Sequence, residues 1–339
     1  MHPANRVLMA ASTAMMLVAC GGGSSAPPAA PVKDANELTT SVPAPTYPAG
    51  SGSPMVFNAV NTLREQMGAG LLAQSAALDK AALAHWKYVN ANADANGPLR
   101  SHYEVAGNPE FTGVDPTARA KFFGYDGTVA EVMYGQNVAD SAEACSASWL
   151  NSVYHVSVLF TGARDVGVSA LTTQDYAGYG KYTVCVVDLG LSASGGEQLP
   201  VDGTIRVYPN ADQTRVPVVF FNQTETPTPL PDLAEVGAPV SLNFKTKSFA
   251  AAGTSAVISI SRFTLTAPGG AALDAKILTN RMTSGGALLT EDSNIDPFTA
   301  TLVPTARLKA NTLYSVSFAG SLNGKAVSKN WSFTTGNDI

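Results

Sequence analysis

Residues 166–170 (VGVSA) and 182–188 (YTVCVVD) decide the fold of the first domain, because apolar side chains recur in them at every second position. This alternation is typical of β-strands that bury one face. A Gly-containing segment lies between the two stretches. We therefore predict two strands joined by a turn region.

The chain before these strands has helical spacing instead. Apolar residues three and four positions apart predict an amphipathic helix over residues 55–67. Ser75 is a suitable N-cap for a longer helix to about residue 92, and Asp115-Pro116 opens a short third helix. A fourth helix is expected over residues 141–151. With the strands, these helices predict a compact mixed α and β domain over residues 55–195.

Short strands dominate from residue 237 to the end of the chain. They are expected at 240–244, 257–265, 287–289, 300–304, 313–318 and 329–334. Asn323-Gly324 between two alternating segments is a strong hairpin signal. The pattern predicts an all-β sandwich over residues 237–339. Residues 196–236, rich in Pro, Thr and Asn, are interpreted as a connector.

The N-terminus is typical of an export signal rather than of a folded element. Residues 1–19 contain Arg6 and an apolar run too short to span a bilayer as a mature helix. Leu17-Val18-Ala19-Cys20 has the form of a lipobox, so we predict cleavage before Cys20 and lipid attachment to its thiol. An ordinary signal peptide with an incidental cysteine is the alternative. Residues 20–54, mostly Gly, Ser, Pro and Ala, are predicted to form a disordered tether.

The composition limits the class of protein further. A chain of 339 residues with 45% hydrophobic and 14% charged residues has room for two cores. The net charge of −5 and the absence of a basic cluster exclude nucleic acid as an expected partner. In an exported chain, Cys145 and Cys185 are expected to form a disulfide, with two free buried thiols as the alternative.

Histidine is scarce in this chain and therefore informative. The four histidines occupy positions 2, 85, 102 and 155, and Glu131 lies between the last two. Two neutral imidazoles and one carboxylate suit Zn²⁺ or another divalent cation with an open position, where bound water is activated for hydrolysis. The same trio also fits a purely structural hydrogen-bonded network. Ring separations above about 8 Å would exclude a shared metal.

His85 and Ser152 have other interpretations. His85, inside a helix beside Trp86, is interpreted as a packing residue. Ser152 lies three residues before His155, but no Gly-x-Ser-x-Gly elbow supports a nucleophilic serine.

Several segments, taken in order, resemble the CAP superfamily, also called SCP-like: the cysteine-rich secretory, antigen 5 and pathogenesis-related group. They are the helix 56–67, the Ala-rich helix around His85, Ser101-His102, Phe111-Thr112, Arg119, Gly124-Tyr125, Glu131, Trp149-(x)₅-His155 and Val166-Gly167-Val168. The resemblance covers roughly residues 55–190. It implies an α-β-α sandwich, so the whole chain is expected to be an α+β protein.

The resemblance also implies a central cleft in which two histidines and acidic side chains hold a divalent metal in some members. His102 and His155 match the histidines, and Glu131 matches the first acidic position. The second acidic position is Ser152 here, and a hydroxyl stabilises a cation less than a carboxylate does. Zinc affinity is therefore expected to fall unless water or Glu104 completes the shell, and Ser152 and Glu104 are placed at the ligand cleft.

The C-terminal part resembles the end of a bacterial Ig-like domain, through residues 311–316, 323–325 and 331–335. The combined expectation is an outer-membrane lipoprotein of the cell envelope whose CAP-like cleft binds a divalent metal, or a small or lipophilic ligand. The Ig-like module would then be a spacer or a binding domain, with an envelope protein as another possible partner. One alternative is metal-assisted hydrolysis with Glu131 as the catalytic residue. The other is an adhesive or scaffolding protein with an idle cleft.

Overall fold

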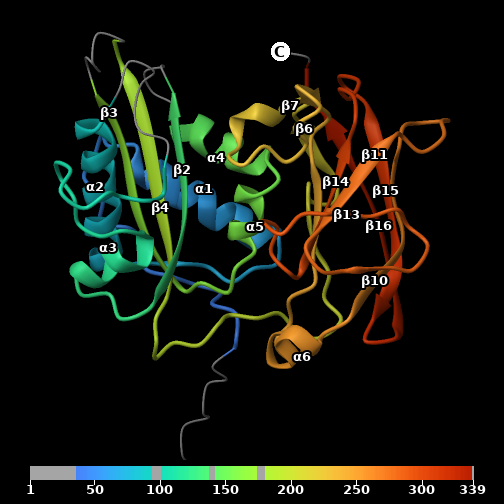
Figure 1. The fold of residues 1–339 in the computed structure, drawn as a ribbon, viewed down its shortest axis with the longest axis horizontal. Helices are drawn as coiled ribbons and strands as arrows, with labels where there is room; N and C mark the ends of the chain where they lie inside the picture. The colour runs from blue at the N-terminus through green and yellow to red at the C-terminus, as the bar shows by residue number, and fades with distance from the viewer. Residues whose placement is uncertain (1–35, 94–100, 137–141, 174–179, 338–339) are drawn as a thin grey trace, which may run out of the picture. The chain divides into compact units, whose positions relative to one another are not determined.

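The computed structural model describes residues 36–93, 101–136, 142–173 and 180–337 (Figure 1). The predicted signal segment 1–19 and the predicted lipidation site Cys20 lie outside these residues. In the part of the chain that is described, no helix combines the length and the apolar character needed to cross a bilayer.

A four-stranded sheet forms the centre of the first part of the chain. Its strands lie in the order β1 (Ala73–Gln74), β3 (Asp165–Thr173), β4 (Tyr182–Leu191) and β2 (Thr128–Gln136). The strands β3 and β4 contain the two stretches predicted as strands, and they pair antiparallel with each other. On its other edge β4 pairs antiparallel with β2, which brings Glu131 opposite Asp188.

Helices cover both faces of this sheet (Figure 1). One face packs against α1 (Ser53–Gln66), α4 (Ala142–Leu150) and α5 (His155–Leu159), with Trp149 in the shared core. The other face packs against α2 (Ala76–Ala91) and α3 (Pro116–Phe122). The predicted α-β-α arrangement is therefore confirmed.

Side-chain caps begin two of these helices where the sequence predicts. Ser75 accepts a hydrogen bond from the Leu78 amide, and Asp115 accepts one from the Ala118 amide. The helix α5 was not predicted, because five residues are too few to show a helical period.

The predicted disulfide is present. Cys145 on α4 and Cys185 on β4 are bonded, with an S–S distance of 2.08 Å. The bond joins the helical layer to the sheet, and the free-thiol alternative is excluded.

The C-terminal part consists of two five-stranded sheets that share one hydrophobic core (Figure 1). One sheet has the order β12 (Thr283–Ser284), β10 (Ile258–Thr266), β15 (Leu313–Leu322), β16 (Lys325–Thr335) and β6 (Gln213–Val216). The other has the order β13 (Thr290–Glu291), β11 (Ala275–Thr279), β14 (Thr299–Pro304), β9 (Val240–Asn243) and β5 (Arg206–Tyr208). The region is thus built mainly of β-strands, with one short helix, α6 (Lys247–Ala252), while its Ig-like identity stays a prediction.

The hairpin signal and the predicted strand at 287–289 have different outcomes. Asn323 and Gly324 both have positive φ and connect β15 to β16, as the Asn-Gly signal predicts. Residues 287–289 instead lie between the two-residue strands β12 and β13, and the strand β11 was not predicted. Strands of two residues are too short to produce an alternating pattern.

The segment 196–236 is more than the connector that the sequence suggests. Its strand β5 pairs with β9, and its strand β6 pairs with β16, so it contributes one edge strand to each sheet. It also contains the small β7–β8 ladder, Phe220–Phe221 against Glu235–Val236, and the turn η1 (Asn222–Thr224). Pairing partners far along the chain stabilise these short strands, and this support has no local sequence signal.

The predicted tether is also corrected for its described part. The Leu71 amide donates to Thr39 O at 2.8 Å, and the Thr39 amide donates to Gln198 Oε1 at 2.7 Å. Farther on, the Tyr47 hydroxyl donates to Asp79 at 2.8 Å. Residues 36–52 therefore run along the first domain, held by these hydrogen bonds and by Val42 and Tyr47, which pack against its core.

Candidate functional site

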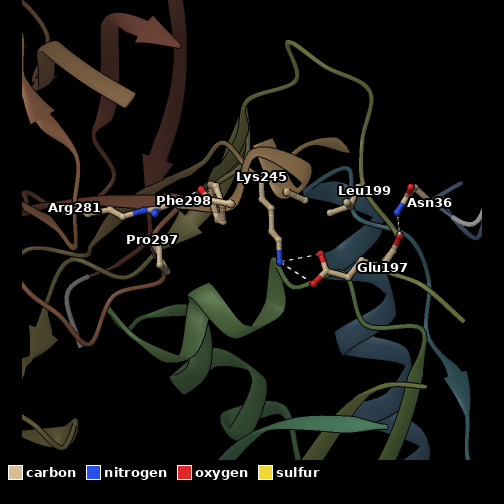
Figure 2. A pocket seen from close by; sticks show the side chains of 9 residues that line it. Asn36, Glu197, Leu199, Lys245, Arg281, Pro297 and Phe298 are labelled. Atoms are coloured by element: carbon tan, nitrogen blue, oxygen red, sulfur yellow. Dashed lines mark hydrogen bonds and ion pairs between the residues drawn. The ribbon is translucent and has the colours of Figure 1, made fainter. Parts of the chain in front are cut away.

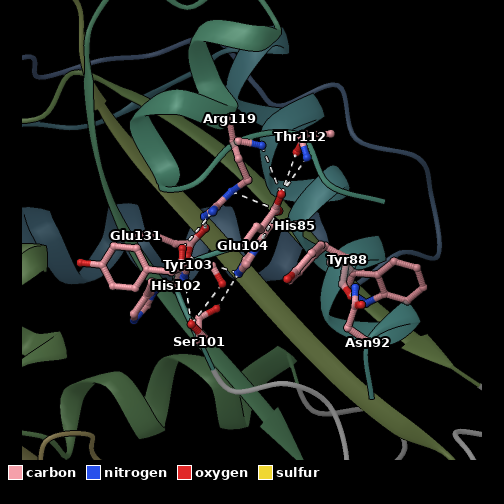
Figure 3. Close-up of polar contacts among 12 residues, drawn as sticks. His85, Tyr88, Asn92, Ser101, His102, Tyr103, Glu104, Thr112, Arg119 and Glu131 are labelled. Atoms are coloured by element: carbon pink, nitrogen blue, oxygen red, sulfur yellow. Dashed lines mark hydrogen bonds and ion pairs between the residues drawn. The ribbon is translucent and has the colours of Figure 1, made fainter. Parts of the chain in front are cut away.

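His102 and Glu131 meet at the edge of the central sheet. The strand β2 carries Glu131, and the loop after α2 carries His102. His102 Nδ1 lies 2.8 Å from Glu131 Oε1 (Figure 3). Because a carboxylate accepts hydrogen bonds, Nδ1 carries the proton of this contact and Nε2 is left for another partner.

Arg119 on α3 holds the other oxygen of Glu131. Its Nη2 donates to Glu131 Oε2 at 2.6 Å, and its Nη1 donates to the His102 carbonyl at 2.9 Å. Burial alone would raise the pKa of Glu131, but the charge of His85, the hydrogen bond from His102 and the charge of Arg119 outweigh it. The pKa of Glu131 is therefore held well below its usual range, and the residue is an anion at neutral pH.

His85 belongs to the same network and is not only a packing residue (Figure 3). Its Nδ1 lies 2.9 Å from Glu104 Oε1, and its Nε2 lies 2.9 Å from the Ser101 carbonyl. Both ring nitrogens thus face oxygen acceptors, an arrangement that the doubly protonated ring satisfies. The network links α2 to the loop that carries His102.

Asp188 is a buried carboxyl group that the sequence analysis treats only as the end of a strand. It lies opposite Glu131 in the β2–β4 register, and both of its oxygens are buried. Burial, and next the charge of Glu131, raise the pKa of Asp188 well above its usual range. Asp188 is therefore the neutral member of a carboxyl pair whose anion is Glu131.

His155 begins α5 and lies beside His102. The two ring centroids are 6.4 Å apart, with an angle of 48° between the ring planes. The side chain of His102 is 37% exposed and that of His155 is 22% exposed, so both rings are reachable from solvent. The separation lies inside the limit of about 8 Å set for a shared metal.

A carboxylate that the sequence analysis missed orients His155. His155 Nδ1 lies 2.8 Å from Oε1 of Glu225, which follows the turn η1 in the segment interpreted as a connector. No motif marks Glu225, and the residue lies 70 positions from His155. The two histidines are thus alike: each has a carboxylate at Nδ1, while Nε2 has no hydrogen-bond partner among the described residues.

Ser152 and Glu104, expected at the ligand cleft, are both buried inside the fold. The Ser152 hydroxyl donates to the Trp149 carbonyl and accepts from the Val156 amide, so it supports the start of α5. Glu104 accepts from His85 and from the Thr112 amide. Neither residue is among those that line the cavity beside His102.

Two cavities are relevant to ligand binding. The first has a volume of about 380 Å³ and is lined by His102, Tyr103, Asp115, Pro116, Thr117, Val129 and Glu131. The second, of about 430 Å³, lies elsewhere, where Lys245 forms an ion pair with Glu197 and Arg281 stacks over Phe298 (Figure 2). Only the first includes predicted site residues.

The donor set differs from the predicted three-ligand site. Over residues 36–93, 101–136, 142–173 and 180–337, no group of three or more His, Cys, Asp or Glu side chains is arranged to hold a metal ion. Glu131 directs its oxygens to His102 and Arg119, which makes it an orienting residue. The nitrogen atoms left to bind a cation are Nε2 of His102 and Nε2 of His155.

The α-β-α fold and the paired histidines define the class of this part of the chain. Residues 57–187 match the family model described as CAP: Cysteine-rich secretory protein family. The match supports the CAP superfamily for this segment, as the order of sequence landmarks predicted. No curated protein gives a significant match to the chain.

Proposed function

We propose that the chain binds a divalent cation through Nε2 of His102 and Nε2 of His155. The observation that supports this proposal is the pairing of both rings with carboxylates at Nδ1, at 2.8 Å in each case. Histidines that bind metals almost always donate their other ring N–H to a carboxylate, a carbonyl or water. The carboxylates fix the tautomer in which Nε2 can bind a cation.

The donors fit a borderline cation such as Zn²⁺, which is held by imidazole nitrogens in many proteins. Two protein ligands are fewer than the three or four of high-affinity zinc sites, so positions stay open for water or for a ligand donor. The neighbouring cavity of about 380 Å³ offers room for a small molecule beside His102. A bound cation would supply positive charge with which an anionic or carbonyl group of that molecule interacts.

Hydrolysis receives less support than binding. Glu131 is the predicted catalytic base, yet its two oxygens are engaged by His102 and Arg119 and its pKa is held low. A general base works best when its pKa lies near the operating pH. The adhesive alternative places function in the C-terminal sheets, and no contact among the described residues favours it.

Calorimetric titration of the purified full-length protein with Zn²⁺ tests the cation site. We expect the variant His102→Ala, His155→Ala to bind at least about tenfold more weakly than the wild type, because both proposed ligands are removed. Glu110→Gln, at an exposed carboxylate, controls for adventitious binding and should leave the heats unchanged. Equal heats in wild type and double variant would reject the site.

We further propose that the protein is exported and held at the outer membrane by lipid on Cys20. The lipobox at residues 17–20 supports this proposal. Cys20→Ser should abolish incorporation of a radiolabelled fatty acid into the protein, because it removes the thiol that takes the lipid. Equal labelling of the wild type and the variant would contradict lipid anchoring.

A further inference from the structure

We propose that Glu225 is a positioning residue for His155, so that the segment following the CAP-type domain completes the cation site. This inference rests on the proposed function. Glu225 lies outside residues 57–187, the part that matches the family model. The C-terminal part of the chain is then a component of the site rather than a spacer.

The contacts of Glu225 are those of an organising anion. Its side chain is 2% exposed. Its Oε1 accepts from the Tyr154 amide at 2.9 Å and the His155 amide at 3.2 Å, in addition to His155 Nδ1 at 2.8 Å. Its Oε2 accepts from the Val153 amide at 2.8 Å. Such charge-assisted hydrogen bonds fix the backbone of residues 153–155 and the ring of His155 together.

A rigid turn presents Glu225 to this backbone. Asn222 in η1 is fully buried, and its side chain is hydrogen-bonded to the carbonyls of Leu230 and Leu233 and to the Leu230 amide. Phe220 and Leu230 of this segment share a hydrophobic cluster with Val153. The position of the Glu225 carboxylate is therefore set by packing on both sides of the contact.

Other contacts hold the same two parts together without touching His155. The Asn151 side chain donates to the Val219 carbonyl at 2.8 Å, and the Tyr154 hydroxyl donates to Asp292 at 2.8 Å. Substitutions at these contacts weaken the attachment of the C-terminal part to the first domain and leave Glu225 unchanged. They provide the controls for the proposal.

Glu225 also accounts for a neutral residue at the second acidic position. Ser152 contributes no charge there, and its hydroxyl instead accepts a hydrogen bond from the Val156 amide in α5. The carboxylate for His155 comes from residue 225, much as Glu131 supplies the carboxylate for His102.

Zn²⁺ titration of the full-length protein tests the inference with three variants. Glu225→Gln keeps the side-chain shape but replaces one acceptor oxygen with an NH₂ group, and we expect affinity to fall by about 10- to 100-fold. Asp292→Ala removes the contact with Tyr154 but keeps Glu225, and Glu235→Gln changes an exposed carboxylate paired with Arg307. Both controls should bind Zn²⁺ as the wild type does. Equal affinity in Glu225→Gln, or an equal loss in Asp292→Ala, would overturn the inference.

A metal-free measurement separates this inference from the cation site itself. The ¹⁵N chemical shifts of the His155 ring report which nitrogen carries the proton. In the wild type we expect the proton on Nδ1, and in Glu225→Gln a shift towards the other tautomer. If the wild type binds no Zn²⁺, the proposed function fails while the tautomer still tests Glu225. A wild-type His155 protonated only on Nε2 overturns the positioning role, even if Glu225→Gln does not fold.

Discussion

Arg119 Nη2 lies 2.6 Å from Glu131 Oε2, and neither side chain has exposed surface. Glu131 also binds His102, so one buried anion joins α3, β2 and the loop that carries the histidine. The orientation of His102 therefore depends on Arg119, which is not among the residues that line the cavity beside His102.

Arg119→Met should destabilise the fold by about 3–5 kcal/mol, because it leaves Glu131 buried without its cationic partner. Urea denaturation at neutral pH measures this loss. Arg307→Met is the matched control: it removes the cation of the exposed Arg307–Glu235 pair and should cost at most about 1 kcal/mol. Equal losses in the two variants would contradict the importance assigned to the buried pair.

Asp188→Asn should raise the melting temperature at pH 7. Burial and Glu131 raise the pKa of Asp188 in the folded state, whereas the unfolded side chain has a pKa of about 3.9. As the pH rises above this unfolded value, the unfolded state ionises first and the wild type loses stability. Asn does not titrate, so the advantage of the variant should disappear near about pH 3.

Melting curves between these two pH values give the test for Asp188. Asp202→Asn is the control of opposite sign, because hydrogen bonds from Ser248 lower the pKa of Asp202. That variant should show no gain at pH 7. A wild type more stable than Asp188→Asn at pH 7 would mean that Asp188 is charged in the fold.

Replacing both Cys145 and Cys185 by Ala should reduce the free energy of unfolding by about 4 kcal/mol, from the loop entropy of the unfolded chain. The two cysteines are 40 positions apart, and their bond holds α4 against β4. Chemical denaturation with and without a reductant measures the loss. Reductant should weaken the wild type and leave the variant unchanged; a loss below about 1 kcal/mol would contradict a stabilising bond.

Local patterns explain the elements that were predicted correctly. Ser75 and Asp115 precede the helices that they cap. Asn323 and Gly324 form a turn that requires positive φ angles, which Asn and Gly adopt readily. Each of these structures depends on residues within a few positions of one another. The strands β5 and β6 depend on partners far along the chain, so the segment containing them was interpreted as a connector.

The residues of the candidate site could be predicted from the sequence, whereas their contacts could not. His102, Glu131 and His155 could be selected from the sequence because histidine is scarce and because their order resembles the CAP superfamily. Their roles could not be assigned in this way: Glu131 binds Arg119 and His102, and Ser152 accepts a hydrogen bond from the Val156 amide. A side chain's role depends on which atoms its oxygens face, and spacing along the chain does not determine this.

The sequence by itself determined the helices with their caps, the alternating strands, the cysteine pair and the histidines worth examining, since each is specified by residue type and short-range spacing. Only the tertiary structure decided that Glu225 orients His155 and that Asp188 lies against Glu131. Hydrogen bonds and charge interactions act over a few ångströms in space, and folding brings together residues whose separation along the chain carries no information about that distance.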